Sequence, residues 1–330
     1  MRHASTARRG FLAAMALSAT AFLGLPTHGH AADAAPVIRV ATGSDPGFAY
    51  LTVAVKKGFF QREGINAELK VFDDGNLTLD NLLTGAAQIG STSEVGSMTR
   101  RAKGGALAVV ASGAQSTDFA GVVGSNSIAI PKDLEGKTVG VTKGSGAHLY
   151  FGYLARKMGL DLTKVNLRFI QPPEAVAALS RGDIDAMVIW EPMLSRIPTM
   201  VRSTHIITRG KQDQAYTANM YLLFSDDLLK NDELARKCMR AILAAADWIP
   251  GNWDEAVKIV ADANHMKPAE AENVMKLNTW LINFDRQQFV RNFDGAGEFA
   301  KAQGLMQQLP SYDGFLRPDV LKAVAPQRVK

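Results

Sequence analysis

The sequence contains little cysteine and little histidine. Its single cysteine, Cys238, has no partner for an internal disulfide, so the fold must be stabilised by its hydrophobic core alone. Leu234, Ala241 and Ile242 flank this cysteine at helical spacing, which is typical of a buried apolar thiol. Only His148, among three histidines after residue 31, falls in a glycine-rich loop, and none has a histidine partner at metal-ligand spacing. We therefore expect no metal site.

Signatures of catalysis and of cofactor binding are also absent. No Gly-x-Ser-x-Gly nucleophile motif occurs. Gly136-Lys137-Thr138 imitates the end of a phosphate-binding loop, but Pro131 stands where that loop needs its first glycine. Gly144-Ser145-Gly146 lacks the third glycine of a dinucleotide fingerprint. The sequence thus predicts no catalytic residue and no cofactor.

Long apolar runs are missing except at the N-terminus. There Arg2, Arg8 and Arg9 precede an apolar run over 11–25, followed by small residues up to Ala32. This run is shorter than the roughly 20 residues that span a bilayer, so residues 1–31 are interpreted as a signal peptide cleaved near Ala31. Arg8-Arg9 resembles a twin-arginine signal, although Sec export stays open. We expect an exported protein.

The excess of positive charge belongs largely to that segment. It holds three of the 37 basic residues and none of the 32 acidic ones, so its removal lowers the formal net charge from +5 to +2. Nucleic acid is therefore not an expected partner. The mature chain still approaches the roughly 250 to 300 residues at which one core stops growing, which favours two domains.

Apolar runs and helical patterns alternate in two similar series, which begin at Val37 and at Thr138. Such alternation predicts largely parallel sheets covered by helices, an α/β class. The series share a Gly-Ser loop after the first strand, Gly43-Ser44 and Gly144-Ser145, which we expect to face each other. They also share glycines that end helices: Gly58 and Gly159, then Gly85 and Gly182.

The remainder of the chain, from Asp226, carries helical patterns only. An apolar run over 220–224 indicates that the chain returns to the first lobe there. We predict a first lobe over 36–122 and 220–330, a second lobe over 126–217, and two crossings near Gly121–Ser127 and Thr217–Tyr221. Two crossings form a hinge.

Several segments together resemble the periplasmic solute-binding proteins of the taurine, aliphatic-sulfonate, nitrate and thiamine-pyrimidine type. The resemblance covers Val37 to about Ala261. It includes Lys57-Gly58-Phe59-Phe60, Gln88-Ile89-Gly90 and 133–141. Its most specific part is 172–179, which begins Pro-Pro-Glu, followed by Arg181-Gly182-Asp183-Ile184-Asp185-Ala186 and Trp190-Glu191-Pro192.

The resemblance implies a type II periplasmic binding protein fold and a receptor that delivers a small solute to an inner-membrane ABC permease. We expect a small anionic organic solute, with a sulfonate or a taurine-like compound favoured. No cysteine directly follows the signal peptide, so we expect no lipid anchor and a receptor that is freely soluble in the periplasm. We also expect a monomer. Two alternatives remain: an enzyme resembling the pyrimidine synthases of the same fold, and a periplasmic sensor subunit.

The main candidate site is the loop Gly144, Ser145, Gly146, Ala147 and His148, which precedes a predicted helix. Free backbone N–H groups and the helix dipole at such a position favour an anion. Ser145 serves equally well as an ordinary helix cap. His148 either lines the cleft or makes a structural hydrogen bond.

The other candidate residues follow predicted strands, where ligands bind in open α/β sheets. The candidates are Asp45, Phe48, Tyr50, Ser93, Glu94, Trp190 and Glu191. We expect one of the two aromatics after Asp45 to face the cleft; the alternative is that Asp45 only caps the helix and that Phe48 or Tyr50 is core. Glu94 either pairs with a ligand amine or is a first-turn acid. Trp190 is predicted as a stacking surface, with a place in the core as the alternative, and Glu191 as an acceptor.

Overall fold

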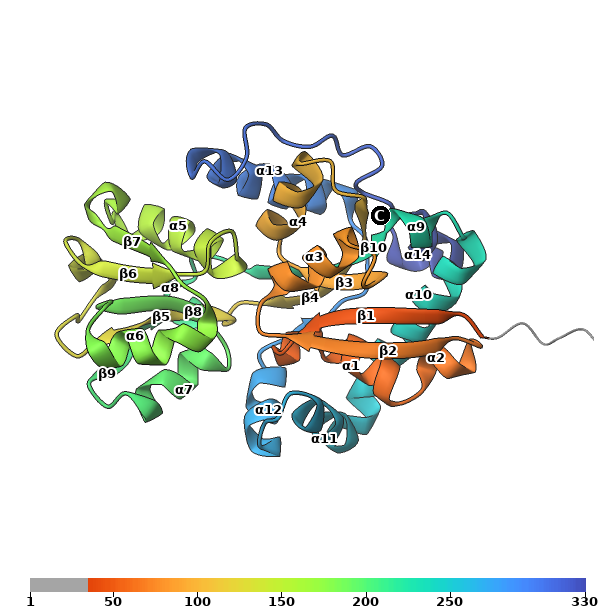
Figure 1. Ribbon diagram of the computed structural model, residues 1–330, viewed down its shortest axis with the longest axis horizontal. Coiled ribbons are helices and arrows are strands. Elements are labelled where there is room, and N and C mark those ends of the chain that lie inside the picture. The colour runs from red at the N-terminus through yellow and green to blue at the C-terminus, as the bar shows by residue number, and fades with distance from the viewer. Residues whose placement is uncertain (1–34) are drawn as a thin grey trace, which may run out of the picture. The chain divides into compact units, whose positions relative to one another are not determined.

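The computed structural model describes residues 35–330, so the predicted signal peptide lies outside the described residues. The described chain forms two α/β lobes, each built around its own sheet (Figure 1). The chain passes between the sheets twice. The predicted fold of two α/β lobes joined by two crossings is confirmed.

The sheet of the first lobe has the order β11-β4-β10-β3-β1-β2. Its strands are β1 Val37–Gly43, β2 Asn66–Phe72, β3 Ile89–Thr92, β4 Leu107–Ser116, β10 Ala218–Ser225 and β11 Thr279–Trp280. β1 is parallel to β2 and β3, whereas β10 runs antiparallel between β3 and β4. The short β11 adds a strand from the tail that we expected to be wholly helical.

The sheet of the second lobe has the order β7-β6-β8-β5-β9. Its strands are β5 Ala120–Ser125, β6 Thr138–Val141, β7 Asn166–Phe169, β8 Ala186–Trp190 and β9 Thr204–Arg209. β6 is parallel to β7 and β8, and β5 is antiparallel to both of its neighbours. The carboxyl ends of β6 and β8 therefore lie at the same edge.

Helices follow the strands in both lobes and make up most of the tail. The first lobe contains α1 Ala49–Lys56, α2 Phe59–Arg62, α3 Gly75–Leu83, α4 Glu94–Ala102, α9 Asp226–Leu229, α10 Asp232–Trp248, α11 Trp253–Ala263, α12 Pro268–Met275, α13 Arg286–Ala302 and α14 Asp319–Val324. The second contains α5 Gly146–Met158, α6 Ala175–Arg181, α7 Met193–Met200 and α8 Gly210–Asp213. The predicted helix-ending residues Gly58, Gly85, Gly159 and Gly182 all have positive φ, the conformation that glycine tolerates best.

Both crossings lie a few residues before their predicted positions. The first occupies 117–119, because β5 already begins at Ala120 and pairs with β8 and β9. Residues 120–122 therefore belong to the second lobe rather than to the first. The second crossing occupies 214–217, between α8 and β10.

Each lobe has a hydrophobic core of its own, which buries the sheet against its helices. A third, small cluster joins Phe48, Ala114 and Met220, with Phe119 packed against it. Because these residues come from β4, β10 and the first crossing, the cluster lies where the lobes meet. Within residues 35–330, no helix has the length and apolar character needed to cross a membrane.

Candidate functional site

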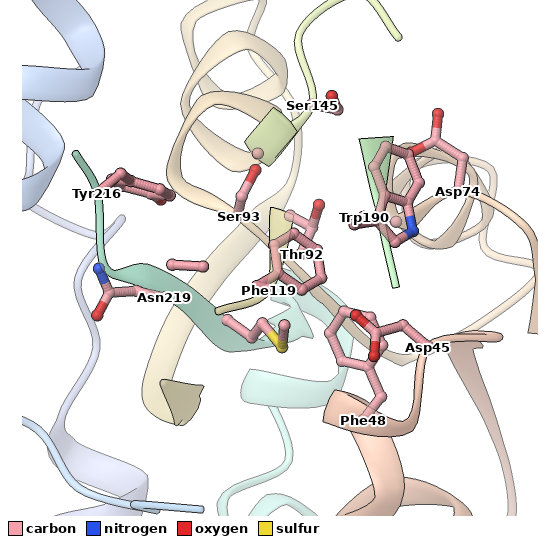
Figure 2. A pocket seen from close by; sticks show the side chains of 14 residues that line it. Asp45, Phe48, Asp74, Thr92, Ser93, Phe119, Ser145, Trp190, Tyr216 and Asn219 are labelled. Atoms are coloured by element: carbon pink, nitrogen blue, oxygen red, sulfur yellow. The ribbon is translucent and has the colours of Figure 1, made fainter. Parts of the chain in front are cut away.

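A pocket lies between the lobes and receives residues from both (Figure 2). It encloses about 450 Å³ of empty space, part of it open to solvent. Its lining comprises Asp45, Phe48, Asp74, Gly75, Thr92, Ser93, Phe119, Ser145, Gly146, Trp190, Tyr216, Ala218, Asn219 and Met220. Both crossings contribute, through Phe119 and Tyr216, so the pocket borders the two crossings as well as both lobes.

The N-termini of two helices meet at this pocket. Ser93 precedes α4 in the first lobe, and Ser145 precedes α5 in the second. A Cβ built on Gly146 would lie only 3.4 Å from the Ser93 Cβ, so the two helix ends directly face each other. The first turn of a helix presents unpaired N–H groups and positive partial charge, and two such ends form a favourable environment for an anion.

The two serines differ in their hydrogen bonding. Ser145 Oγ accepts from the His148 N–H at 3.2 Å and donates to the Thr142 carbonyl at 2.8 Å. Ser93 makes no cap hydrogen bond with its side chain. Its hydroxyl is therefore the one of the two that remains available to a solute.

Aromatic side chains form a second part of the lining. The rings of Phe119 and Trp190 are nearly parallel, with an interplanar angle of 9° and centroids 6.3 Å apart. Trp190 ends β8 and Phe119 belongs to the first crossing, so β5–β8 pairing positions both. Phe48 completes the apolar surface from the first lobe. Such surfaces pack against the apolar body of a solute and exclude water.

The charged side chains of the lining are acidic. Asp45 and Asp74 are both buried, and no lysine or arginine of the described chain lines the pocket. Burial, reinforced by the negative charge of Glu191, raises the pKa of Asp45 to about 7 against the opposing hydrogen bond from Gly47. Burial also raises the pKa of Asp74. The pocket thus combines acidic side chains with helix N-termini.

Six of the predicted site residues line this pocket: Asp45, Phe48, Ser93, Ser145, Gly146 and Trp190. The other six lie outside its lining: Tyr50, Glu94, Gly144, Ala147, His148 and Glu191. Of the two Gly-Ser loops that we expected to face each other, only the second contributes a lining residue, and Ser93 takes the place opposite it.

Tyr50 and Glu94 are packed inside the first lobe instead. Tyr50 is fully buried and shares a hydrogen bond of 3.1 Å with Ser91 Oγ. The 3₁₀ turn η1, Pro46–Phe48, shifts the phase of the following helix, so that Phe48 faces the pocket and Tyr50 the core. Glu94 is bound by side chains from the second crossing and β10.

The remaining three loop residues and Glu191 are held within the second lobe by hydrogen bonds or by burial in its core. His148 Nδ1 accepts from the Gly144 N–H at 3.2 Å, which corresponds to the structural alternative for this histidine. Burial lowers the pKa of His148 to about 4. Ala147 is buried in the core of the second lobe. Glu191 accepts from Arg209 Nη2 at 2.9 Å, which holds it in the second lobe.

Eight lining residues were not predicted: Asp74, Gly75, Thr92, Phe119, Tyr216, Ala218, Asn219 and Met220. Asp74 and Gly75 follow β2, so the rule that ligands bind at carboxyl ends of strands could have found them. The residues of the crossings carry no comparable signal, because their position depends on which sheet each neighbouring strand joins.

No group of three or more His, Cys, Asp and Glu side chains within residues 35–330 is arranged to hold a metal ion. Cys238 is buried in the core of the first lobe, in α10, as its spacing predicted. Burial raises the pKa of its thiol to about 12. The thiol is therefore remote from the pocket lining and protonated.

Relatives among named proteins include two that are similar over most of their length. A candidate aliphatic sulfonates-binding protein of Bacillus subtilis (strain 168) is 27% identical over 79% of this chain and 80% of its own length. The taurine-binding periplasmic protein of Escherichia coli (strain K12) is 22% identical over 68% of this chain and 72% of its own length.

Solved structures share the fold. The alkanesulfonate-binding protein SsuA from Xanthomonas axonopodis pv. citri, bound to MOPS, superposes with a TM-score of 0.73 at 19% identity, covering 85% of this chain and 98% of SsuA. The desulfurization enzyme DszB also superposes, with a TM-score of 0.62 at 14% identity, covering 88% of this chain and 99% of DszB. The chain therefore has the periplasmic binding protein fold. The family model described as NMT1/THI5 like matches residues 45–256, and the chain belongs to this family.

Proposed function

We propose that this chain is the solute-binding receptor of an ABC importer, which closes its two lobes over a small organic solute of the sulfonate or taurine-like class. The observation that carries the proposal is the pocket itself, whose lining comes from both lobes and both crossings. The names of the Bacillus and Escherichia relatives support the solute class.

In this proposal the sulfonate lies in the pocket beside the N-termini of α4 and α5, next to the point where Ser93 and Gly146 face each other. Backbone N–H groups from both lobes then bind one anion, so the solute joins the lobes and stabilises the closed form. The organic part of the solute packs against Phe48, Phe119 and Trp190.

The closed receptor is proposed to deliver its solute to an inner-membrane permease, acting as a monomer in the periplasm after removal of the signal peptide. Binding without turnover is favoured by the partners of the lining residues. Ser145 Oγ is already engaged with Thr142 and His148, and the His148 ring accepts from Gly144 rather than from a serine. This arrangement offers no nucleophile paired with a base.

Thermal unfolding in the presence of candidate solutes tests the proposal. A solute at about 100 times its Kd adds roughly 2.7 kcal/mol to the free energy of unfolding, which raises Tm by several degrees. We expect this rise with taurine or short alkanesulfonates, and none with nitrate, aromatic carboxylates or pyrimidines. A rise with pyrimidines alone would overturn the assigned class.

Removal of the Ser93 hydroxyl tests where the sulfonate binds. Ser93→Ala removes a hydroxyl that caps no helix, so it should leave Tm of the free protein unchanged and weaken sulfonate binding about tenfold. Ser97→Ala is the matched control, because the Ser97 hydroxyl bonds within α4 and does not line the pocket. Equal Kd values for the two variants in isothermal titration calorimetry would argue against the site.

A further inference from the structure

One carboxylate oxygen in the pocket is buried without a hydrogen-bond partner. Asp45 is 3% exposed, and its Oδ1 accepts from the Gly47 N–H at 2.7 Å. Its Oδ2 has no partner among the described residues. A buried acceptor without a donor costs about 1–3 kcal/mol, and more when it is charged. A hydrogen-bond donor from outside the described residues would therefore stabilise this oxygen.

The charges around Asp45 determine which kind of donor would bind there. Glu191 adds negative charge near it, and Asp74 lines another part of the same pocket. The cation beside Glu191, Arg209, is engaged by both Glu191 and Asp118, at 2.9 and 2.8 Å. The cation near Asp74, Arg100, is paired with Asp80 at 2.9 Å. An anionic group of the solute would be repelled here, whereas a cationic N–H group would be attracted.

The anion site and Asp45 lie at different ends of the pocket. Figure 2 shows Ser93 and Ser145 toward one end, with Asp45 and Phe48 at the other and the carboxylate of Asp45 directed toward the labelled side chains. Trp190 lies between them in this view. A solute with groups of opposite charge at its two ends would match this arrangement.

We propose that the solute carries a protonated amine, or another cationic N–H group, that donates to Asp45 Oδ2. The inference rests on the proposed function, because it places the sulfonate of the same molecule at the N-termini of α4 and α5. It assigns the receptor to aminosulfonates in preference to simple alkanesulfonates. Asp45 is the residue that makes the distinction.

Matched pairs of solutes test this preference. Taurine and propane-1-sulfonate differ only in an ammonium replaced by a methyl group, and 4-(aminomethyl)benzenesulfonate and 4-ethylbenzenesulfonate form a corresponding aromatic pair. In at least one pair we expect the amine-bearing member to bind about 10- to 100-fold more tightly in isothermal titration calorimetry, as a charge-assisted hydrogen bond allows. Equal Kd values within each pair that binds would overturn the inference and leave the proposed function standing.

The amines without a sulfonate, propylamine and 4-ethylbenzylamine, separate the two proposals. Binding of these amines without binding of any sulfonate would support the role of Asp45 and overturn the sulfonate receptor. Absence of binding by every probe would overturn both.

Asp45→Asn should abolish the preference. Asparagine keeps the acceptor that caps η1 through the Gly47 N–H, so the variant should fold, which its Tm checks. We expect the amine-bearing solute to lose most of its advantage, while its amine-free partner binds as well as before or better. Asp161→Asn is the matched control: Asp161 caps the 3₁₀ turn η3, Leu162–Lys164, in the same way, at 3.0 Å from the Thr163 N–H, outside the pocket.

The pH dependence separates an ionised Asp45 from a protonated one. With the pKa of Asp45 near 7 in the free protein, ionisation between pH 6 and 8 should strengthen binding of the aminosulfonate, whose aliphatic ammonium stays charged over this range. The amine-free partner should bind equally or more weakly as pH rises. An aminosulfonate affinity that falls with pH would show that Asp45 donates a proton to the solute, which contradicts the proposal.

Discussion

At the residue scale, Glu94 is the most unusual side chain outside the pocket lining. It is fully buried, and its carboxylate accepts hydrogen bonds from the Tyr216 hydroxyl at 2.8 Å, Asn219 Nδ2 at 3.0 Å and the Tyr221 hydroxyl at 3.3 Å. Within residues 35–330 it forms no salt bridge. The three donors attach the start of α4 to the second crossing and to β10.

The pKa of Glu94 predicts a pH-dependent stability. Burial raises it from 4.5 to about 7, against the hydrogen bonds that lower it. The native state therefore binds a proton more tightly than the unfolded chain, and the free energy of unfolding should fall as pH rises from 4.5 to 7. Asp45 contributes with the same sign.

Glu94→Gln should flatten this slope by an amount on the order of 1–3 kcal/mol between pH 4.5 and 7. The amide keeps an acceptor for Asn219, so the variant should fold. Urea unfolding of both proteins at several pH values measures the difference. Parallel stability profiles for the wild type and the variant would contradict the assignment of this titration to Glu94.

Much of the residue-scale pattern could be predicted from the sequence where the backbone decides it. Gly159 and Gly182 end helices with positive φ because a side chain there would be strained. The choice between Phe48 and Tyr50 could not be made, since it depends on a single 3₁₀ turn before α1. His148 bonds within its own loop, to Gly144. Glu94 instead takes its partners from the second crossing and β10, more than 100 residues along the chain, which no local pattern reveals.

At the element scale, the order of strands explains which lining residues escaped prediction. Alternating apolar and helical patterns determine the α/β class, but they do not say that β5 pairs with β8 and β9. That pairing places the first crossing at 117–119 and brings Phe119 beside Trp190. Non-local pairing therefore builds the aromatic part of the site.

Close packing of α5 against α13 offers a test at the same scale. Figure 1 shows α13 beside α4 and α5, so this helix of the tail contacts the second lobe. A Cβ on Gly152 of α5 would lie 2.4 Å from a ring carbon of Phe299 in α13. The His148 ring also packs edge-on against Phe299, with centroids 5.0 Å apart.

Gly152→Ala should therefore weaken the contact between the lobes without unfolding either one. Alanine improves the helix itself by about 0.5–1 kcal/mol, so any loss must come from the clash with Phe299. We expect a larger radius of gyration in small-angle X-ray scattering of the free protein. In a Phe299→Ala background the same substitution should have no further effect, and an undiminished effect there would contradict the proposed clash.

At the scale of the whole molecule, an ion pair connects the two lobes on the side away from α13. Arg196 of α7 donates through both Nε and Nη2 to the carboxylate of Glu270 in α12, with an Nη2–Oε2 distance of 2.9 Å. This hydrogen bonding lowers the pKa of Glu270 and raises that of Arg196. Because α7 belongs to the second lobe and α12 to the tail of the first, the pair joins the lobes in the arrangement seen here and would break if they separated.

Arg196→Ala should shift the protein toward the open form, since it removes a contact specific to the closed form. A partly exposed pair contributes about 0.2–1 kcal/mol, and two parallel hydrogen bonds favour the upper end, so we expect about a threefold to fivefold weaker Kd for a bound sulfonate. The change should lie mainly in the dissociation rate, measured by stopped-flow displacement, because the pair forms after the solute has entered.

Arg317→Ala is the matched control: it breaks a two-bond pair with Asp319, both at 2.8 Å, within the first lobe. Equal dissociation rates for the two variants would mean that the Arg196 pair does not hold the lobes closed, whereas recovery in the charge-swapped Arg196→Glu/Glu270→Arg protein would assign the effect to the pair itself.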